Sequence, residues 1–387
     1  MAESPLNRWG DTEDPSPTAG AKPNSSRTSR RGWAIAVIAV AILGAGSALL
    51  WLGSTQKVRG RAPGEFESCE ALLLAWHDGL TDSQSQTLIE VIDTIRQHVK
   101  VYLLVPDQSQ QRAATDMLEA ARVPTSAVTF VHARVGAPWT RDYGPVVTRS
   151  RRGHYEMLDF IYAQSFHHPE ANRQNEDRIP GKLAAALGMP SVHVPLVVDG
   201  GNLLCNGAGL CLTTERILDE NPHYSREEVS ELLRHYLGAD QVLFLEPLVE
   251  ERTRHVDVFC TFTSPDVVVV CQCDEKSDPL NFQILERNAQ RLTDLMTPRG
   301  YLEVVRIPVP RRVRDGRWWT YTNVVYANGV LLVPSYPGVA DGLNEQAIDL
   351  YGRLLPGWKV VGIDPTPFTQ IGGALHCLTV NLAQVTR

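Results

Sequence analysis

Residues 71–76 read ALLLAW, residues 83–98 read SQSQTLIEVIDTIRQH and residues 101–105 read VYLLV. The outer two runs are short and almost wholly apolar, as buried strands are. The middle run places apolar residues three and four positions apart, as on one face of a helix. Strand, helix and strand in this order are typical of parallel strands joined by a crossover helix. The sequence therefore predicts an α/β fold.

The same alternation continues along the rest of the chain. Roughly five strand–helix–strand passes fit in about 320 residues, which is too many for a simple domain of about 150 residues and natural for a repeated module closed into a ring. We expect one folded domain over residues 64–387, with a hairpin at 321–333 that turns at Asn328–Gly329. The further segments are apolar runs at 128–133, 157–161, 192–198, 242–245, 267–271, 302–308 and 359–362, and helices at 108–121, 172–187, 226–237, 282–296 and 343–355.

An apolar stretch precedes this domain. Residues 33–53 read WAIAVIAVAILGAGSALLWLG and contain no charged residue. A helix of this length spans about 30 Å, the thickness of the hydrocarbon core of a bilayer. We therefore expect a transmembrane helix at 33–53, between a disordered tail at 1–32 and a linker at 54–63. The alternative is a cleaved signal peptide, but the apolar part of such peptides usually has only about 7 to 15 residues.

Charge distinguishes the N-terminal stretch from the body of the protein. The sequence has 37 Lys and Arg against 44 Asp and Glu, a net charge of −7. The first 62 residues hold 8 basic and 4 acidic residues, which leaves 29 basic and 40 acidic residues in the remainder. This acidic body argues against a general nucleic-acid binder and suits a cationic partner. Four basic residues at 22–31 precede the apolar stretch and three at 57–61 follow it, so the positive-inside rule favours an exported body anchored to the membrane.

Four short segments place polar residues among glycines or strand residues, where chains often carry function. Each alone has an ordinary explanation: Asp142 could be a turn carboxylate paired with Arg141, and Cys377 could be a buried structural thiol. His255 and Asp257 are two positions apart and would lie on the same face of a strand. The segments are Trp139-Thr140-Arg141-Asp142-Tyr143-Gly144-Pro145, Asp199-Gly200-Gly201-Asn202, His255-Val256-Asp257 and Gly372-Gly373-Ala374-Leu375-His376-Cys377.

Together these segments supply the groups that can attack a cationic, planar carbon. A cysteine thiolate can act as nucleophile and a histidine can transfer protons, while two carboxylates can hold a guanidinium through charge-assisted hydrogen bonds. A zinc site would be the competing use of such residues, but the sequence has no His-x-x-x-His or Cys-x-x-Cys pair. We therefore expect an enzyme that uses neither a metal nor another cofactor.

At these segments the chain resembles the agmatine deiminases and the bacterial peptidylarginine deiminases of the guanidine-modifying superfamily. The resemblance covers about residues 64–379 and carries its motifs in the same order. They are a Trp-x-Arg-Asp-x-Gly-Pro segment at 139–145, an acidic-Gly-Gly-Asn segment at 199–202, a His-x-Asp segment at 255–257, a Tyr-x-Asn segment at 321–323 and a Gly-Gly-x-x-His-Cys segment at 372–377.

The resemblance implies a five-bladed α/β propeller, the pentein fold, preceded here by the transmembrane helix. It also implies metal-free hydrolysis of a terminal guanidino group to a ureido group and ammonia, through a covalent amidino-cysteine intermediate. Cys377 resembles the nucleophile of the family and His255 its general acid and base. Asp199 resembles the carboxylate that orients this histidine.

The remaining implied roles concern substrate binding. Asp142 and Asp257 resemble the two carboxylates that clamp the guanidinium, and Asn323 would line the pocket. The implied partner is a small cationic guanidino compound, agmatine, or an arginine-containing peptide. An exported body would favour the peptide, because peptides would then be accessible.

The chain also departs from the family pattern. Arg254 stands where the family usually has a glycine, which would place a cation beside the site unless the side chain points to solvent. Residues 65–70 and 378–382 replace family segments that help to define the substrate, so agmatine and peptidyl-arginine both remain open. The alternatives are amidino transfer to an amine and a membrane-anchored guanidinium-binding protein without turnover. Cysteine proteolysis is less expected, because an oxyanion hole does not need two extra carboxylates.

Overall fold

One strand arrangement recurs five times in the described part of the chain. In four consecutive copies a first strand lies antiparallel to a second, and the second lies parallel to a third that follows a helix. These copies are β5 (Val146–Ser150), β6 (Tyr155–Ile161) and β7 (Ser191–Val197); β8 (Leu204–Cys205), β9 (Leu210–Thr214) and β10 (Gln241–Leu245); β11 (Cys260–Ser264), β12 (Val267–Gln272) and β15 (Glu303–Pro308); and β16 (Val325–Ala327), β17 (Val330–Pro334) and β18 (Lys359–Ile363).

The fifth copy joins the two ends of the described chain. Strand β19 (Val380–Leu382) lies antiparallel to β2 (Ala71–Ala75), with Val380 opposite Leu73. Strand β2 is parallel to β3 (Lys100–Val105), and β4 (Val128–His132) extends the sheet as a further parallel strand. The strand–helix–strand segment that predicted an α/β fold therefore forms parallel neighbours, as expected.

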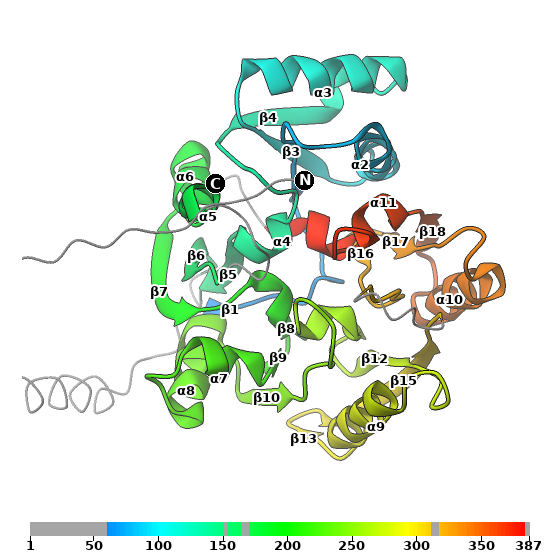
Figure 1. The fold of residues 1–387 in the computed structure, drawn as a ribbon. Helices are drawn as coiled ribbons and strands as arrows, with labels where there is room; N and C mark the ends of the chain where they lie inside the picture. Colours follow the sequence, from blue (N-terminus) through cyan, green and yellow to red (C-terminus); the bar gives the residue numbers. More distant parts are fainter. Residues whose placement is uncertain (1–59, 151–152, 164–169, 311–316, 384–387) are drawn as a thin grey trace, which may run out of the picture. The chain divides into compact units, whose positions relative to one another are not determined.

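Helices lie between the second and third strands of every copy and pack against the sheets (Figure 1). They are α2 (Asp82–Ile95), α5 (Glu170–Glu176) with α6 (Ile179–Leu187), α7 (Arg216–Glu220) with α8 (Arg226–Leu237), α9 (Pro279–Thr293) and α10 (Asp341–Leu354), and α3 (Gln108–Ala120) leads from β3 to β4. Local sequence explains their starts: Thr81 and Ser225 each form a capping box with the residue three positions later.

The turn of the hairpin predicted at 321–333 is confirmed. Ala327 lies opposite Val330, so the loop between β16 and β17 consists of Asn328 and Gly329 alone. Both residues have positive φ, 44° and 89°, which is the conformation that the commonest two-residue hairpin turn requires. The Asn328 side chain also accepts a hydrogen bond from the backbone N–H of Cys69 at 3.0 Å, which ties this turn to the segment before β2.

The structure, a computed structural model, describes residues 60–150, 153–163, 170–310 and 317–383. The tail expected at 1–32 and the transmembrane helix expected at 33–53 lie outside these residues. Within them, every helix is too short or too polar to cross a membrane. The linker expected at 54–63 needs correction at its end: Gly60 and Arg61 form strand β1, which pairs with β5, so the folded domain starts before residue 64.

The segments that carry the motifs occupy equivalent places in the repeat, because each ends just before the first strand of a copy. They are α4 (Thr140–Tyr143) before β5, the 3₁₀ turns η2 (Gly200–Asn202) before β8, η3 (Val256–Val258) before β11 and η4 (His376–Leu378) before β19, and residues 320–323 before β16. Turn α4 packs against η2 and η4, and η2 packs against η3. Figure 1 shows α4 beside the red segment that contains η4. The repeat thus brings residues far apart in sequence to one place.

Candidate active site

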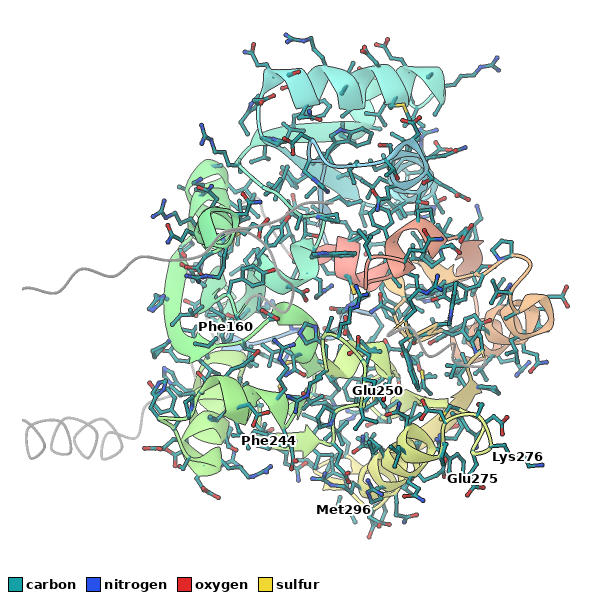
Figure 2. All side chains as sticks on the ribbon, in the orientation of Figure 1. Phe160, Phe244, Glu250, Glu275, Lys276 and Met296 are labelled. Carbon is teal, nitrogen blue, oxygen red and sulfur yellow. The ribbon has the colours of Figure 1, made fainter. Side chains whose placement is uncertain are left out.

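The six residues expected to carry the chemistry are all buried and form two groups of polar contacts, one around His255 and one around Asn323. Their exposed fractions do not exceed 5%. The residues are Asp142, Asp199, His255, Asp257, Asn323 and Cys377. Figure 2 draws the side chains of the described residues on the ribbon.

His255 lies between two carboxylates. Its Nε2 atom is 3.2 Å from Oδ2 of Asp199, and its Nδ1 atom is 3.5 Å from Oδ1 of Asp142. Burial alone would lower the pKa of His255, but the negative charges of Asp142 and Asp199 raise the pKa to about 9. The imidazole is therefore protonated at neutral pH and can donate a proton to a ligand.

Asp199 is held in place from several directions. Its Oδ1 atom accepts a hydrogen bond from the backbone N–H of Ala163 at 3.0 Å, and its Oδ2 atom lies 3.5 Å from Nη2 of Arg216. Arg216 is itself fixed by Glu220, 2.5 Å away, and by the backbone carbonyl of Thr253. A carboxylate supported in this way can keep the imidazole of His255 in one orientation.

Two carboxylate oxygens are left for a ligand. Oδ1 of Asp142 and Oδ1 of Asp257 are buried and accept no hydrogen bond from the described residues. Burial, together with the nearby charges of Asp199 and Asp257, raises the pKa of Asp142 to about 7, although His255 acts in the opposite direction. Buried carboxylate oxygens without donors are costly, and a cation with N–H groups would satisfy them.

Gly201 lets three of these polar side chains approach the backbone closely. A Cβ atom at this position would lie 2.8 Å from both Oδ1 of Asp142 and Nδ1 of His255, and 3.1 Å from Oδ2 of Asp257. Any side chain here would therefore displace these groups. Residue 200 is a glycine for a different reason, because a Cβ atom there would clash with the backbone carbonyl of Arg141. The two glycines of the Asp-Gly-Gly-Asn segment thus allow close approach to a pocket and to a neighbouring turn.

Cys377 lies in turn η4, next to Asn323. Its Sγ atom is 3.6 Å from Oδ1 of Asn323, and the same oxygen accepts a hydrogen bond from the backbone N–H of His376 at 2.9 Å. Burial, and then the negative charges of Asp257 and Asp142, raise the pKa of Cys377 well above its usual value. The thiol is therefore protonated at neutral pH, and a bound cation would favour the thiolate.

Three residues of the site were not predicted from the sequence. Nη1 of Arg141 lies 2.6 Å from Oε1 of Glu65, and Nε2 of His376 lies 2.8 Å from Oε2 of the same carboxylate. Nδ1 of His376 lies 2.7 Å from Oδ2 of Asp257. Arg141 thus pairs with Glu65 and not with Asp142, its neighbour in sequence. The sequence offered only the position of these residues inside or next to the motifs.

One expectation around His255 is corrected by the structure, and the open question about Arg254 is answered. Residues 256–258 form the turn η3 and not a strand, yet Nδ1 of His255 and Oδ2 of Asp257 both lie close to Gly201. The Arg254 side chain points away from the pocket: its Nη1 atom is 3.1 Å from Oδ2 of Asp219, and 43% of its side chain is exposed. Arg254 has φ of 58°, a conformation that glycine adopts more readily. Backbone conformation therefore accounts for the family's usual glycine.

Among the residues that the structure describes, no group of His, Cys, Asp or Glu side chains is arranged to hold a metal ion. Two carboxylates and an imidazolium instead lie around Gly201. The thiol of Cys377 is linked to them through Asn323, which contacts both Cys377 and Asp257. This arrangement can bind a planar cation with several N–H groups and attack its carbon.

Comparison with known proteins agrees with this chemistry. A model of the Porphyromonas-type peptidyl-arginine deiminase family matches residues 61–382. A protein of Latilactobacillus sakei whose name assigns it to the agmatine deiminases is 26% identical, over 84% of this chain and 96% of its own.

Solved structures share the fold. The agmatine deiminase of Enterococcus faecalis superposes with a TM-score of 0.73 at 22% identity, over 84% of this chain and 96% of that one. The agmatine deiminase of C. jejuni gives a TM-score of 0.70 at 22% identity, over 85% and 97%. The fold is therefore mixed α/β and pentein-like. The family model covers nearly all described residues, and so the chain belongs to the Porphyromonas-type peptidyl-arginine deiminase family, as a hydrolase that acts on the carbon–nitrogen bonds of guanidino groups.

Proposed function

We propose that this protein hydrolyses agmatine to N-carbamoylputrescine and ammonia, with Cys377 as nucleophile. The observation that carries this proposal is the pair of buried oxygens, Oδ1 of Asp142 and Oδ1 of Asp257, which lack hydrogen-bond donors beside His255. A guanidinium supplies such donors in a planar, forked arrangement. Its positive charge offsets the negative charge of the two carboxylates.

The first half of the reaction transfers the amidino group to the enzyme. The bound cation favours ionisation of the Cys377 thiol, and the thiolate attacks the guanidinium carbon to form a carbon–sulfur bond. The imidazolium of His255 then protonates the departing nitrogen, so the carbon–nitrogen bond breaks and ammonia leaves. The ammonia takes up the proton that the thiol lost and leaves as ammonium, and His255 is left neutral.

The second half returns the enzyme to its starting state. Neutral His255 removes a proton from water, and the hydroxide attacks the amidino carbon. The carbon–sulfur bond then breaks, which yields the ureido product and the Cys377 sulfur, protonated again by the proton that the product loses. Asp199 keeps His255 oriented in both halves. Asn323, which contacts Asp257 and Cys377, lines the pocket.

Agmatine is proposed because the curated relatives that cover most of this chain carry the name of agmatine deiminases. Peptidyl-arginine is the second candidate, because the matching family model describes peptidyl-arginine deiminases and because residues 65–70 and 378–382 depart from the usual agmatine deiminase pattern. Transfer to an amine is not favoured, since the relatives are named deiminases. A binding protein without turnover loses its one argument, because Arg254 points away from the pocket.

The substrate is tested by measuring ammonia release from agmatine, free arginine and peptides with internal or C-terminal arginine. We expect kcat/KM for agmatine to exceed the others by about tenfold or more, the ratio that one well-placed contact can give. Faster turnover of a peptide would reassign the substrate to peptidyl-arginine. Ammonia release from none of them, or equal release by the Cys377→Ser variant, would overturn the proposed reaction.

We also infer that the five strand triplets form the five blades of a propeller and that residues 33–53 anchor the domain outside the cytoplasm. The fivefold recurrence of the pairing supports the first inference, and the uncharged stretch with its flanking basic residues supports the second. A reporter that is active only after export, fused after Arg387, tests the orientation. Carbonate extraction of membranes tests the anchor, and release of the whole protein would contradict it.

A further inference from the structure

Four charged side chains form a row of contacts that ends at Asp257. Arg141 contacts Glu65 at 2.6 Å, Glu65 contacts His376 at 2.8 Å, and His376 contacts Asp257 at 2.7 Å. The charges alternate along this row, and three of its four members have exposed fractions of 8% or less. Such alternation allows buried charges to compensate one another.

His376 is the central member of the row, and its two contacts decide its protonation. Each ring nitrogen lies within 2.8 Å of a carboxylate oxygen. A neutral imidazole has a single N–H and can donate to only one of two ionised carboxylates, whereas an imidazolium can donate to both. The geometry therefore requires a doubly protonated ring, or else a proton on one of the carboxylates.

The electrostatics favour the proton on the ring. Burial and the positive charge of Arg141 would lower the pKa of His376, but Glu65 and Asp257 outweigh them and raise it. Burial would raise the pKa of Glu65, yet the positive charges of Arg141 and His376 lower it to about 2. Glu65 is thus ionised at neutral pH. Burial, and also the charge of Glu65, raise the pKa of Cys69 and of Tyr326, so both of these neighbours stay neutral.

The row also sets the direction in which Asp257 faces. Its Oδ2 atom accepts hydrogen bonds from Nδ1 of His376 at 2.7 Å and from Nδ2 of Asn323 at 3.1 Å. Its Oδ1 atom accepts none from the described residues. One oxygen is therefore fixed to the protein, and the other is left for the substrate.

We propose that His376 is a permanently protonated positioning residue, which Glu65 keeps charged and which holds Asp257 turned toward the guanidinium. This role rests on the proposed reaction, in which Asp257 is half of the clamp. The row also links the neighbours of two other site residues, because Arg141 precedes Asp142 and His376 precedes Cys377. Glu65 would thereby hold α4 and η4 in their places relative to Asp257.

The test compares pH profiles of kcat/KM in the full-length protein. In Glu65→Gln, His376 loses one of the two carboxylates that raise its pKa, so its proton is lost at lower pH. The alkaline limb, which His255 sets in the wild type, then follows His376 and moves down by about one pH unit or more. Activity should recover toward the wild-type value as the pH falls. Glu67→Gln is the matched control, because Glu67 lies two positions away and pairs with Arg61 instead. Glu67→Gln should leave both the acid and the alkaline limb of the pH profile unchanged.

A second variant tests the effect on Asp257. In His376→Gln the clamp carboxylate loses its cationic partner and the hydrogen bond that fixes its Oδ2 atom. KM should rise about tenfold or more while kcat falls less, because ground-state binding of the cation is weakened. An unchanged alkaline limb in Glu65→Gln, together with a lowered kcat and an unchanged KM in His376→Gln, would mean a merely structural role and would overturn the proposal.

Direct observation of the ring separates this proposal from the proposed reaction. The His376 signal of wild-type protein labelled with ¹⁵N-histidine, assigned by its loss in His376→Gln, should be that of an imidazolium at pH 7. A neutral ring at pH 7 overturns the positioning role even if turnover is normal. An imidazolium in a protein that releases no ammonia from any guanidino compound would instead support the row and contradict the proposed reaction.

Discussion

A Cβ atom on Gly201 would lie 2.8 Å from Nδ1 of His255. A side chain at residue 201 would therefore push the imidazole away. We predict that Gly201→Ala lowers kcat/KM by about 10²-fold or more, because the methyl group displaces the imidazole and the neighbouring carboxylates from their positions. The matched control is Gly352→Ala in α10, where an added Cβ atom has no neighbour within 4 Å. It should keep full activity and stabilise the fold by about 0.4 to 1 kcal/mol. Normal activity of Gly201→Ala would show that turnover does not need this close approach.

Cys377→Ser should abolish turnover while the protein stays folded. Serine has nearly the same size as cysteine but is far less nucleophilic near neutral pH, so we expect a loss of about 10³-fold or more in kcat. Ammonia release and thermal unfolding are measured together. Cys205→Ser, on strand β8 and half-buried, is the control and should remain active. Retained activity of Cys377→Ser would rule out the nucleophile assignment.

Replacement of either clamp carboxylate should weaken binding of the transition state. Asp142→Asn and Asp257→Asn each remove one charge from a desolvated ion pair, and we expect a loss on the order of 2 to 5 kcal/mol in kcat/KM. Asp266→Asn, which breaks only an exposed pair with Arg299, should have little effect. A clamp variant that keeps kcat/KM within about twofold does not belong to the clamp, since a single lost contact costs more.

The pH dependence of kcat/KM should be bell-shaped. Asp142 must be ionised to hold the guanidinium and has a pKa of about 7, while His255 must be protonated and has a pKa of about 9. Asp199 raises both values, so Asp199→Asn should move both limbs to lower pH, in addition to lowering the rate. A profile whose limbs stay fixed in Asp199→Asn would contradict the assignment of both groups.

Arg254→Gly tests whether the departure from the family's glycine affects catalysis. The guanidinium of Arg254 pairs with Asp219 at the surface, so kcat/KM should change by less than about twofold. The substitution should also relieve the strain of a positive φ, which costs roughly 1 kcal/mol for a residue with a side chain. A large gain in activity would instead mean that the Arg254 cation repels the substrate. The free energy of unfolding measures the second effect.

The sequence predicted which segments lie close together better than it predicted the contacts between their side chains. A motif preserves residue types in order, so Asp199, His255 and Cys377 could be proposed as site residues from the sequence, and their catalytic roles stay predictions. The contact of Glu65 with His376 joins residues 311 positions apart, and no periodicity encodes it. The turn at 256–258 was mistaken for a strand because both conformations can direct residues two apart toward one pocket. The strand at Gly60–Arg61 is too short to show any alternation.

The pairing of β19 with β2 also bears on how the enzyme folds during synthesis. The sheet that carries Cys377 into place is assembled from strands near opposite ends of the described chain. Closing so long a loop is slow, and the contacts that reward it form late. During synthesis, Asp142, Asp199 and His255 would therefore be made before the segment that carries Cys377. The proposed reaction cannot begin until strand β19 has been made and has paired with β2.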